Sequence, residues 1–432
     1  MPSSYSSHTN TIRLILTTLM SSLLIMTMSG CATSTQRAAT FHQSEHYYNY
    51  LQPSLEQYIS ETRRWLSQHR DFISEDHARE LQMNSPFFLH SAENTHVIML
   101  IHGLGDSPFY FRDIADSLHQ QGYDVLSILL PGHGSKPSDL LKPHYEDWQN
   151  MVDFYAFQLK QRYANVWLGG FSTGANLATT HALVHEDIQG LLLFSPGFQT
   201  HLPFLEKLTP MIATFKDWGW QTKEDNLARY SSSPLNATIA YSDSAEVVRD
   251  LLKKKDLTIP TFIAMSEKDS VIDAEAIKTL FLEAMPNPNN VFIMYGETEH
   301  SENRFKTKSM RLPELRISTG SHMSPLFSPD NPYYGQHGEK RICRNGLSPR
   351  AKAHCLSNQE IWFSAWGHYE SDKVHARLTW NPHFDDLLEN LSQFVTTPAR
   401  SDSTNNALRL SERREEKQKN HDQHLVPDSS HL

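Results

Sequence analysis

The hydrophobic positions along the chain alternate between two spacings. Nearly continuous apolar runs predict strands that are buried on both faces, and these lie at 96–101, 124–130, 164–168, 188–195, 261–265 and 290–295. A shorter run at 86–89 predicts a first strand. Segments with apolar residues at helical spacing separate these runs, at 110–121, 145–162, 175–183 and 274–285. The alternation predicts an α/β fold with a mostly parallel, doubly wound sheet.

Two long segments interrupt this alternation. Residues 197–255 contain three prolines, several aromatic residues and no long apolar strand, so we expect a small cap of short helices over the carboxyl edge of the sheet. Residues 301–380 have no regular period, so we expect an irregular insertion. A final amphipathic helix at 383–395 follows it.

The first 31 residues have the pattern of an export signal. Arg13 provides a positive charge, and residues 14–28 form an apolar run that is short for a membrane span. The run ends in small residues before Cys31, which resembles a bacterial lipoprotein signal whose cysteine is acylated. We therefore expect lipidation at Cys31 and a lipid anchor in the cell envelope, with Ala32 favouring the outer membrane. An ordinary secretory signal and an uncleaved anchor are the alternatives.

These patterns divide the 432 residues into four parts. A signal peptide at 1–31 is followed by a polar tether and an amphipathic helix (53–72) at 32–85. The main domain spans 86–397, and a polar, charged tail forms 398–432. The predicted domain, with 39% hydrophobic residues in the whole chain, is long enough to bury a large core.

The charge balance excludes one class of partner. The formal net charge is −10 and no basic stripe is visible, so we expect no nucleic-acid partner. The 24 histidines show no pair with a clear metal-ligand spacing, so we predict neither a metal nor an organic cofactor.

The remaining two cysteines enclose a short loop. In an exported protein Cys343 and Cys355 are in an oxidising compartment, so a disulfide between them is the simplest inference. Two free thiols are the alternative.

The turn Gly170-Phe171-Ser172-Thr173-Gly174 lies between a predicted strand and a predicted helix. A strand, a Gly-x-Ser-x-Gly turn and a helix form the nucleophile elbow of α/β-hydrolases. A Cβ at Gly170 or Gly174 would collide with neighbouring backbone, while Ser172 is expected in a strained, exposed position.

Ser172 needs a base, and the base needs a group to orient it. Asp269 follows the strand at 261–265, and His300 follows the strand at 290–295. Because the carboxyl ends of parallel strands share one edge of a sheet, we expect Ser172, Asp269 and His300 to converge there.

Both partners of the serine have rivals. Asp273 and Glu267 lie near Asp269 in sequence and are alternative acids. His322, after a possible extra strand at 315–318, is the alternative base. We prefer His300 because it follows the last regular strand at the short distance that the geometry requires.

An acyl-transfer site also needs backbone donors for the oxyanion. The N–H of Thr173, directly after the nucleophile, is one candidate. The N–H of Leu104, in the loop His102-Gly103-Leu104-Gly105, is the other. His102 and His133 lie in glycine loops, where we expect structural hydrogen bonding.

Several motifs together resemble the bacterial carboxylesterase and monoacylglycerol-lipase-like branch of the α/β-hydrolase superfamily, which includes the serine aminopeptidase-like hydrolases. They are His102-Gly103-Leu104-Gly105-Asp106-Ser107, Leu130-Pro131-Gly132-His133-Gly134, Asp147-Trp148, the elbow at 170–174, and Asp269. The resemblance covers about 86–300 and the helix near 383–395. It implies ester hydrolysis through an acyl-enzyme, with a small cap that shapes the acyl pocket. Thr173 and the insertion at 301–380 depart from the usual pattern.

The combined prediction is a membrane-tethered serine hydrolase that acts on a small acyl ester, with short or medium acyl chains or a monoacylglycerol-like substrate. A peptidase or amidase that uses the same three residues is the nearest alternative. A surface lipoprotein that binds without catalysis is the alternative from another class.

Overall fold

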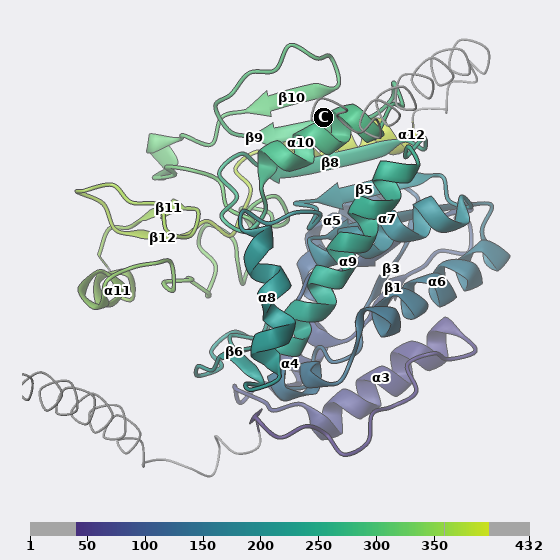
Figure 1. The fold of residues 1–432 in the computed structure, drawn as a ribbon, viewed down its shortest axis with the longest axis horizontal. Coiled ribbons are helices and arrows are strands. Elements are labelled where there is room, and N and C mark those ends of the chain that lie inside the picture. Colours follow the sequence, from purple (N-terminus) through teal and green to yellow (C-terminus); the bar gives the residue numbers. More distant parts are fainter. Residues whose placement is uncertain (1–39, 358, 397–432) are drawn as a thin grey trace, which may run out of the picture.

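The computed structural model describes residues 40–357 and 359–396 (Figure 1). The predicted signal at 1–31 with Cys31, and the predicted tail at 398–432, lie outside the described residues. Among the helices of the described part, none combines the length and the apolar character that crossing a bilayer requires.

An eight-stranded sheet forms the centre of the molecule (Figure 1). Its order is β1-β3-β2-β4-β5-β8-β9-β10, and β1 is the single antiparallel member. The strands are β1 (Phe87–Leu89), β2 (His96–Ile101), β3 (Asp124–Ile128), β4 (Asn165–Phe171), β5 (Gly190–Phe194), β8 (Thr261–Ser266), β9 (Val291–Tyr295) and β10 (Phe305–Lys308). The predicted mostly parallel, doubly wound sheet is confirmed.

The strand order reverses beside β2. The chain passes from β2 to β3 on one side and then returns to β4 on the other side of β2. Open α/β sheets bind their ligands at the carboxyl ends of the strands where the order reverses. The ends of β2 and β4 are therefore the expected position of a site.

Helices cover both faces of the sheet (Figure 1). In β2, Val97 and Met99 contribute to one core while Ile98 and Leu100 contribute to the other, as the two-residue period of a strand requires. The first core includes residues of α3 (Leu55–His69), α6 (Tyr145–Arg162), α7 (Thr173–His185), α9 (Leu235–Lys254) and α10 (Ala274–Ala284). The second includes residues of α4 (His77–Asn84), α5 (Arg112–Gln120) and α12 (Phe384–Thr396).

The segment 197–255 differs from its prediction. Its first half has the expected short elements, which are α8 (Pro203–Ala213), β6 (Trp218–Trp220) and β7 (Ser233–Pro234). Its second half is the 20-residue helix α9, which buries Ala237, Ala240 and Val248 in the first core. The prediction of short helices throughout is wrong, because the small residues of α9 allow it to pack within the main helical layer.

The insertion 301–380 is largely irregular, as predicted, and its described residues contain three short strands, one α-helix and one 3-10 helix (Pro313–Leu315). The strand β10 extends the main sheet parallel to β9. The others are α11 (Pro349–Cys355), β11 (Trp362–Ser364) and β12 (His375–Arg377), and β11 pairs with β12. No strand forms at the possible site 315–318.

The predicted disulfide between Cys343 and Cys355 is present. Both cysteines are buried with Ile361 and Ala376 in a small separate core. This core contains few side chains, so the covalent link carries much of the stability of this part of the insertion.

We expect the Cys343→Ser/Cys355→Ser double variant to lose about 3 kcal/mol of unfolding free energy, because a loop of this length is no longer closed in the unfolded chain. Thermal unfolding of protein lacking residues 1–31 measures the loss. A reductant should lower the melting temperature of the parent protein and leave that of the double variant unchanged. Equal melting temperatures of the oxidised parent and the double variant would contradict the prediction.

Candidate active site

The predicted nucleophile elbow is present between β4 and α7. Ser172 has φ 52° and ψ −114°, a region that side-chain-bearing residues rarely adopt. A Cβ on Gly170 would lie 2.3 Å from the backbone of Gly174, and one on Gly174 would lie 2.0 Å from the carbonyl oxygen of Ile101. Only glycine therefore fits at either position, as predicted from the motif.

The backbone of Ser172 is fixed on both sides. Its N–H donates to the carbonyl of Phe194, at 3.0 Å, and its carbonyl accepts the N–H of Gly197, at 3.1 Å. The residue is 8% exposed, so it lies just beneath the surface at the carboxyl edge of the sheet. The strained turn is held by its neighbours on β5 and on the segment that follows β5.

Asp269 lies at the same edge, after β8, and is 3% exposed. Its Oδ1 accepts the N–H groups of Val271 and Ile272, at 2.8 and 3.0 Å. Its Oδ2 lies 2.6 Å from Nδ1 of His322. The carboxylate is therefore oriented by backbone donors and directed at one histidine.

His322 connects this carboxylate to the elbow. Its ring centroid lies 4.9 Å from that of Phe171, the residue before Ser172. Because an ionised carboxylate only accepts hydrogen bonds, the Nδ1 that faces Asp269 carries the proton, and Nε2 remains for a second partner. His322 and Asp269 thus have the relation that the histidine and acid of a serine-hydrolase triad require.

The insertion positions His322 through its backbone. The carbonyl of His322 accepts the hydroxyl of Ser195, at 2.8 Å, and the N–H of Ser321 donates to Oγ of Ser324, at 3.0 Å. A Cβ on Gly320 would lie 2.5 Å from Oγ of Ser266, so glycine permits the close approach to the end of β8. The irregular segment is thereby packed against the sheet where the histidine enters.

The structure brings His322 to Asp269 in place of the expected His300. The ring of His300 packs on Phe305, with centroids 4.8 Å apart, and its Nε2 has no hydrogen-bond partner within the described residues. The loop before it is bound elsewhere, because Glu267 accepts the N–H of Glu297, at 2.6 Å. The chain then adds β10 to the sheet before it returns to the site.

The alternative acids have structural roles. Asp273 is the N-cap of α10, and its Oδ1 accepts the N–H groups of Glu275 and Ala276, at 3.1 Å each. Glu267 binds the loop after β9, as described above. Neither forms an ion pair with a histidine in the part of the chain that the structure describes.

The two predicted oxyanion donors lie on adjacent segments. Thr173 begins α7, and the first N–H groups of a helix have no partner within it. Leu104 follows β2, and its loop is held where Gly105 N–H donates to Nε2 of His133, at 2.9 Å. The close contact of Gly174 with the carbonyl of Ile101 brings the loop and the helix start together.

His102 and His133 form structural hydrogen bonds, as predicted. Nε2 of His102 accepts the N–H of Leu130, at 3.1 Å, and its Nδ1 lies 2.8 Å from the carbonyl of Gly103. Burial lowers the pKa of His102 from 6.5 to about 4, and burial also holds the pKa of His133 well below its ordinary value. Both rings are therefore neutral at pH 7, which leaves one nitrogen of each free to accept.

Residues 92–302, just under half of the chain, match a family model described as serine aminopeptidase, S33. The matched region contains Ser172 and Asp269 and ends before His322. Together with the sheet order, this match identifies the fold as that of an α/β-hydrolase. The two groups of described side chains with metal-ligand geometry lie outside the candidate site.

Two curated proteins are similar to part of the chain. The thermostable monoacylglycerol lipase of Bacillus sp. (strain H-257) is 33% identical over 108 residues, which are 25% of this chain and 42% of the lipase. The carboxylesterase of Bacillus subtilis (strain 168) is 21% identical over 206 residues, which are 43% of this chain and 77% of that enzyme. Among solved structures, the monoacylglycerol lipase of Paleococcus ferrophilus is 16% identical with a TM-score of 0.41, over 52% of this chain and 90% of that one.

We expect the unfolding free energy to fall as the pH drops from about 6.5 to about 4. In this range the unfolded chain takes up a proton at His102, while the buried His102 of the folded chain stays neutral. A folded-state pKa below the unfolded value stabilises the protein above the unfolded pKa, and the gain disappears as the pH falls towards the folded pKa. The shift corresponds to at most about 3 kcal/mol.

Urea unfolding between pH 7 and pH 4.5 should show a shallower pH dependence of the unfolding free energy for His102→Gln than for the parent. His337→Ala, at an exposed histidine, should match the parent. An unchanged slope in His102→Gln would contradict the prediction.

Proposed function

We propose that the chain is a serine hydrolase that cleaves carboxylic esters, with Ser172 as nucleophile, His322 as base and Asp269 as the orienting acid. The observation that carries the proposal is the 2.6 Å contact between Nδ1 of His322 and Oδ2 of Asp269, beside the strained nucleophile elbow. Along the chain the three residues follow the order serine, acid, histidine, which is also the order in α/β-hydrolases.

In the proposed reaction, Oγ of Ser172 attacks the ester carbonyl while Nε2 of His322 accepts its proton. The imidazolium that forms is stabilised by the carboxylate of Asp269. The same proton then passes to the leaving alcohol oxygen. A water molecule, deprotonated by His322, attacks the acyl-enzyme and releases the carboxylic acid.

The negative charge on the tetrahedral oxygen needs fixed donors. We assign them to the N–H groups of Leu104 and Thr173, and the positive N-terminal end of α7 adds to their effect. These donors belong to the backbone, so they do not depend on the side chain at position 173. The presence of Thr173, where a larger residue is more usual, changes only the adjoining wall of the site.

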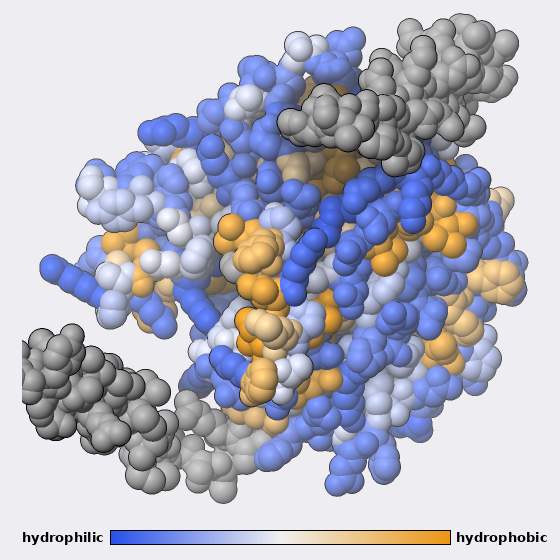
Figure 2. All heavy atoms as spheres, viewed as in Figure 1, coloured by the Kyte–Doolittle hydropathy of each residue, from blue (hydrophilic) through white to orange (hydrophobic). Residues whose placement is uncertain are grey.

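Two observations support an acyl substrate. The apolar side chains of Leu202, Phe204, Met211 and Phe215 are between 61% and 90% exposed, and Figure 2 shows apolar atoms gathered along α8. This segment adjoins the site, since Nε2 of His201 lies 2.7 Å from the carbonyl of Asp269. The partial similarity to a monoacylglycerol lipase and a carboxylesterase supports the same substrate class.

The name of the matched family favours a second candidate, a serine aminopeptidase. Hydrolysis of an amide uses the same nucleophile and base, so the two candidates differ only in substrate. Comparing p-nitrophenyl esters of short and medium acyl chains with an aminoacyl p-nitroanilide distinguishes them.

We expect Ser172→Ala and His322→Ala each to lower kcat for the preferred ester by about 10³-fold or more, since each removes a member of the triad. The matched control is His300→Ala, which should retain kcat within about twofold. Circular dichroism should confirm that all three variants are folded. Loss of activity in His300→Ala but not in His322→Ala would assign the base to His300 instead.

The parent protein should also react with a fluorophosphonate probe, and Ser172→Ala should not. Absence of both turnover and labelling in the parent would contradict the hydrolase and would favour a binding protein.

We also propose that the protein is exported and lipidated at Cys31, which rests on the sequence pattern of residues 13–31. One acyl chain alone gives weak membrane binding, whereas several chains give stable anchoring. We expect the parent to fractionate with membranes and Cys31→Ala to move to the soluble fraction. Equal distribution of the two proteins would contradict lipidation at this residue.

A further inference from the structure

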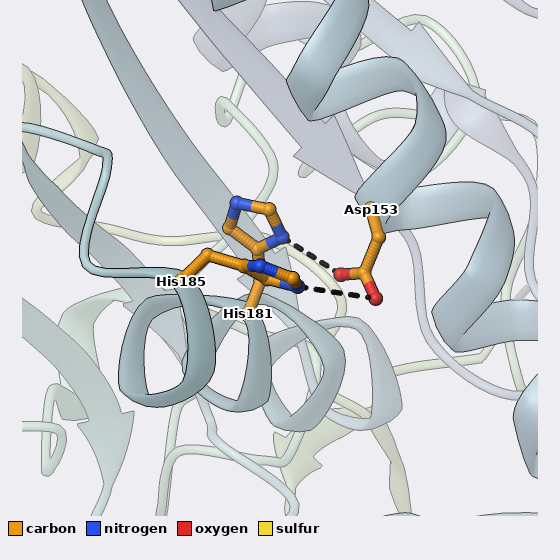
Figure 3. A group of neighbouring side chains, drawn as sticks. All are labelled: Asp153, His181 and His185. Carbon is orange, nitrogen blue, oxygen red and sulfur yellow. Dashed lines mark hydrogen bonds and ion pairs between the residues drawn. The ribbon is translucent and has the colours of Figure 1, made fainter.

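A second group of ionisable side chains lies where α6 passes α7, outside the candidate active site (Figure 3). Asp153 projects from α6, and His181 and His185 project from successive turns of α7. Asp187 follows the end of α7. The side chain of His181 is 2% exposed, while those of Asp153, Asp187 and His185 are 30%, 34% and 42% exposed.

Each carboxylate in this group faces an imidazole. Oδ1 of Asp153 lies 2.7 Å from Nδ1 of His181, and its Oδ2 lies 3.5 Å from Nε2 of His185 (Figure 3). Two ligands of one tetrahedral zinc ion, each about 2.0–2.1 Å from the metal, are roughly 3.3–3.5 Å apart. The separation between Asp153 and His185 matches that value, while the separation between Asp153 and His181 is that of the hydrogen bond that the ion would replace.

We propose that Asp153, His181 and His185 form a binding site for a divalent transition-metal ion, zinc being the best match. Each of the three residues offers one ligand atom, and these three atoms all lie within 4.8 Å of one another. We assign them to Nδ1 of His181, Nε2 of His185 and the carboxylate of Asp153, the atoms that face one another. Two imidazole nitrogens and one carboxylate oxygen are a known ligand set for such ions. The exposure of His185 and Asp153 leaves room for water as a fourth ligand.

The fourth residue of the group supports the assignment. Nε2 of His181, the ring nitrogen that does not face Asp153, lies 3.1 Å from Oδ1 of Asp187. Metal-binding histidines commonly donate their other N–H to a carboxylate, which fixes the tautomer and the ring orientation. Nε2 of Gln149 donates to Oδ1 of Asp153, at 2.8 Å, and orients the ligating carboxylate in the same way.

The local charge also favours a cation. Across the described residues, the ion pairs of Asp153 and Asp187 are formed with His181 and His185 and with no lysine or arginine. Both histidines lie in the last turns of α7, where the helix dipole is negative. By contrast, the group His368, Glu370 and His375 already contains a cation, because Glu370 is paired with Lys373.

The ion has a structural role in this proposal. His181 follows Ser172 by nine residues, which is about 13 Å along a helix. The ion therefore links α6 to the C-terminal end of α7, while the proposed nucleophile lies at the N-terminal end of the same helix. The ion takes no part in the ester chemistry. The proposal is independent of the function assigned to Ser172.

The test is metal binding by protein that lacks residues 1–31 and has been freed of metal by a chelator. Calorimetric titration with Zn²⁺ should give one equivalent per chain, and Zn²⁺ should raise the melting temperature while Mg²⁺ and Ca²⁺ should not. Co²⁺ should give the visible absorption of a four- or five-coordinate ion with nitrogen ligands.

Matched variants assign the binding to these residues. His185→Ala and Asp153→Asn should abolish the Zn²⁺-dependent rise in melting temperature, and Asp187→Asn should weaken binding by about 10- to 100-fold. His337→Ala, at an exposed histidine outside the group, should bind as the parent does. His185→Gln provides a second variant if His185→Ala is unstable without metal.

Two results would overturn the proposal. One is the absence of saturable Zn²⁺ binding by the parent, which would leave the group as a buried His181 hydrogen-bonded between two carboxylates. The other is binding of equal affinity by the parent, His185→Ala and Asp153→Asn, which would place the ion elsewhere.

Discussion

The contact between the start of α7 and the end of β2 constrains the whole candidate site. Gly174 lies so close to the carbonyl of Ile101 that a Cβ would be 2.0 Å from the oxygen, and this contact fixes the helix against the central strand. The chain can enter the helix at this distance only through the strained turn at Ser172, with φ 52°. The position of Ser172 just beneath the surface and the approach of the Leu104 loop to the helix start are therefore consequences of one packing constraint. The strain is retained because two hydrogen bonds hold the turn, one from the N–H of Ser172 to the carbonyl of Phe194 and one from the N–H of Gly197 to the carbonyl of Ser172.

The histidine reaches this site by a different route. Ser172 and Asp269, the proposed nucleophile and acid, each lie just after a strand of the sheet, whereas His322 comes from an insertion that first adds β10 to the sheet edge. Its position is defined by contacts with Ser195 and with the end of β8, where Gly320 allows the two segments to meet. A helix or strand is not needed to place the ring, since backbone hydrogen bonds and the Asp269 carboxylate determine its orientation.

Most of the fold could be predicted from the sequence, because buried strands and amphipathic helices have distinct periods. The elbow could be predicted as well, since its glycines are required by backbone contacts that the motif implies. The choice between His300 and His322 could not be made from periods or motifs in the sequence. The sequence distance of His300 from β9 suits the compact form of the fold, and nothing in the sequence reveals that Glu267 binds the N–H groups of Glu297 and Thr298. The prediction that no histidine pair has a clear metal-ligand spacing overlooks His181 and His185, which are four residues apart on one helix. Their carboxylate partner lies on another helix, so only the packing of α6 on α7 reveals the complete group.

The dependence of His322 on the insertion links the candidate site to the stability of 301–380. The hydroxyl of Ser321 donates to the carbonyl of Leu378, and Oγ of Ser318 lies 3.1 Å from Nε2 of His375. The segment that carries His322 is therefore joined to the first residue of β12 and to the residue directly after this strand. The disulfide closes the part of the insertion that lies between these two regions of sequence. The same insertion also reaches the cap, where the hydroxyl of Tyr334 donates to Asn226, at 2.7 Å. A change that loosens the small core around the cysteines therefore acts on both the proposed base and the cap, although it touches neither the serine nor the acid.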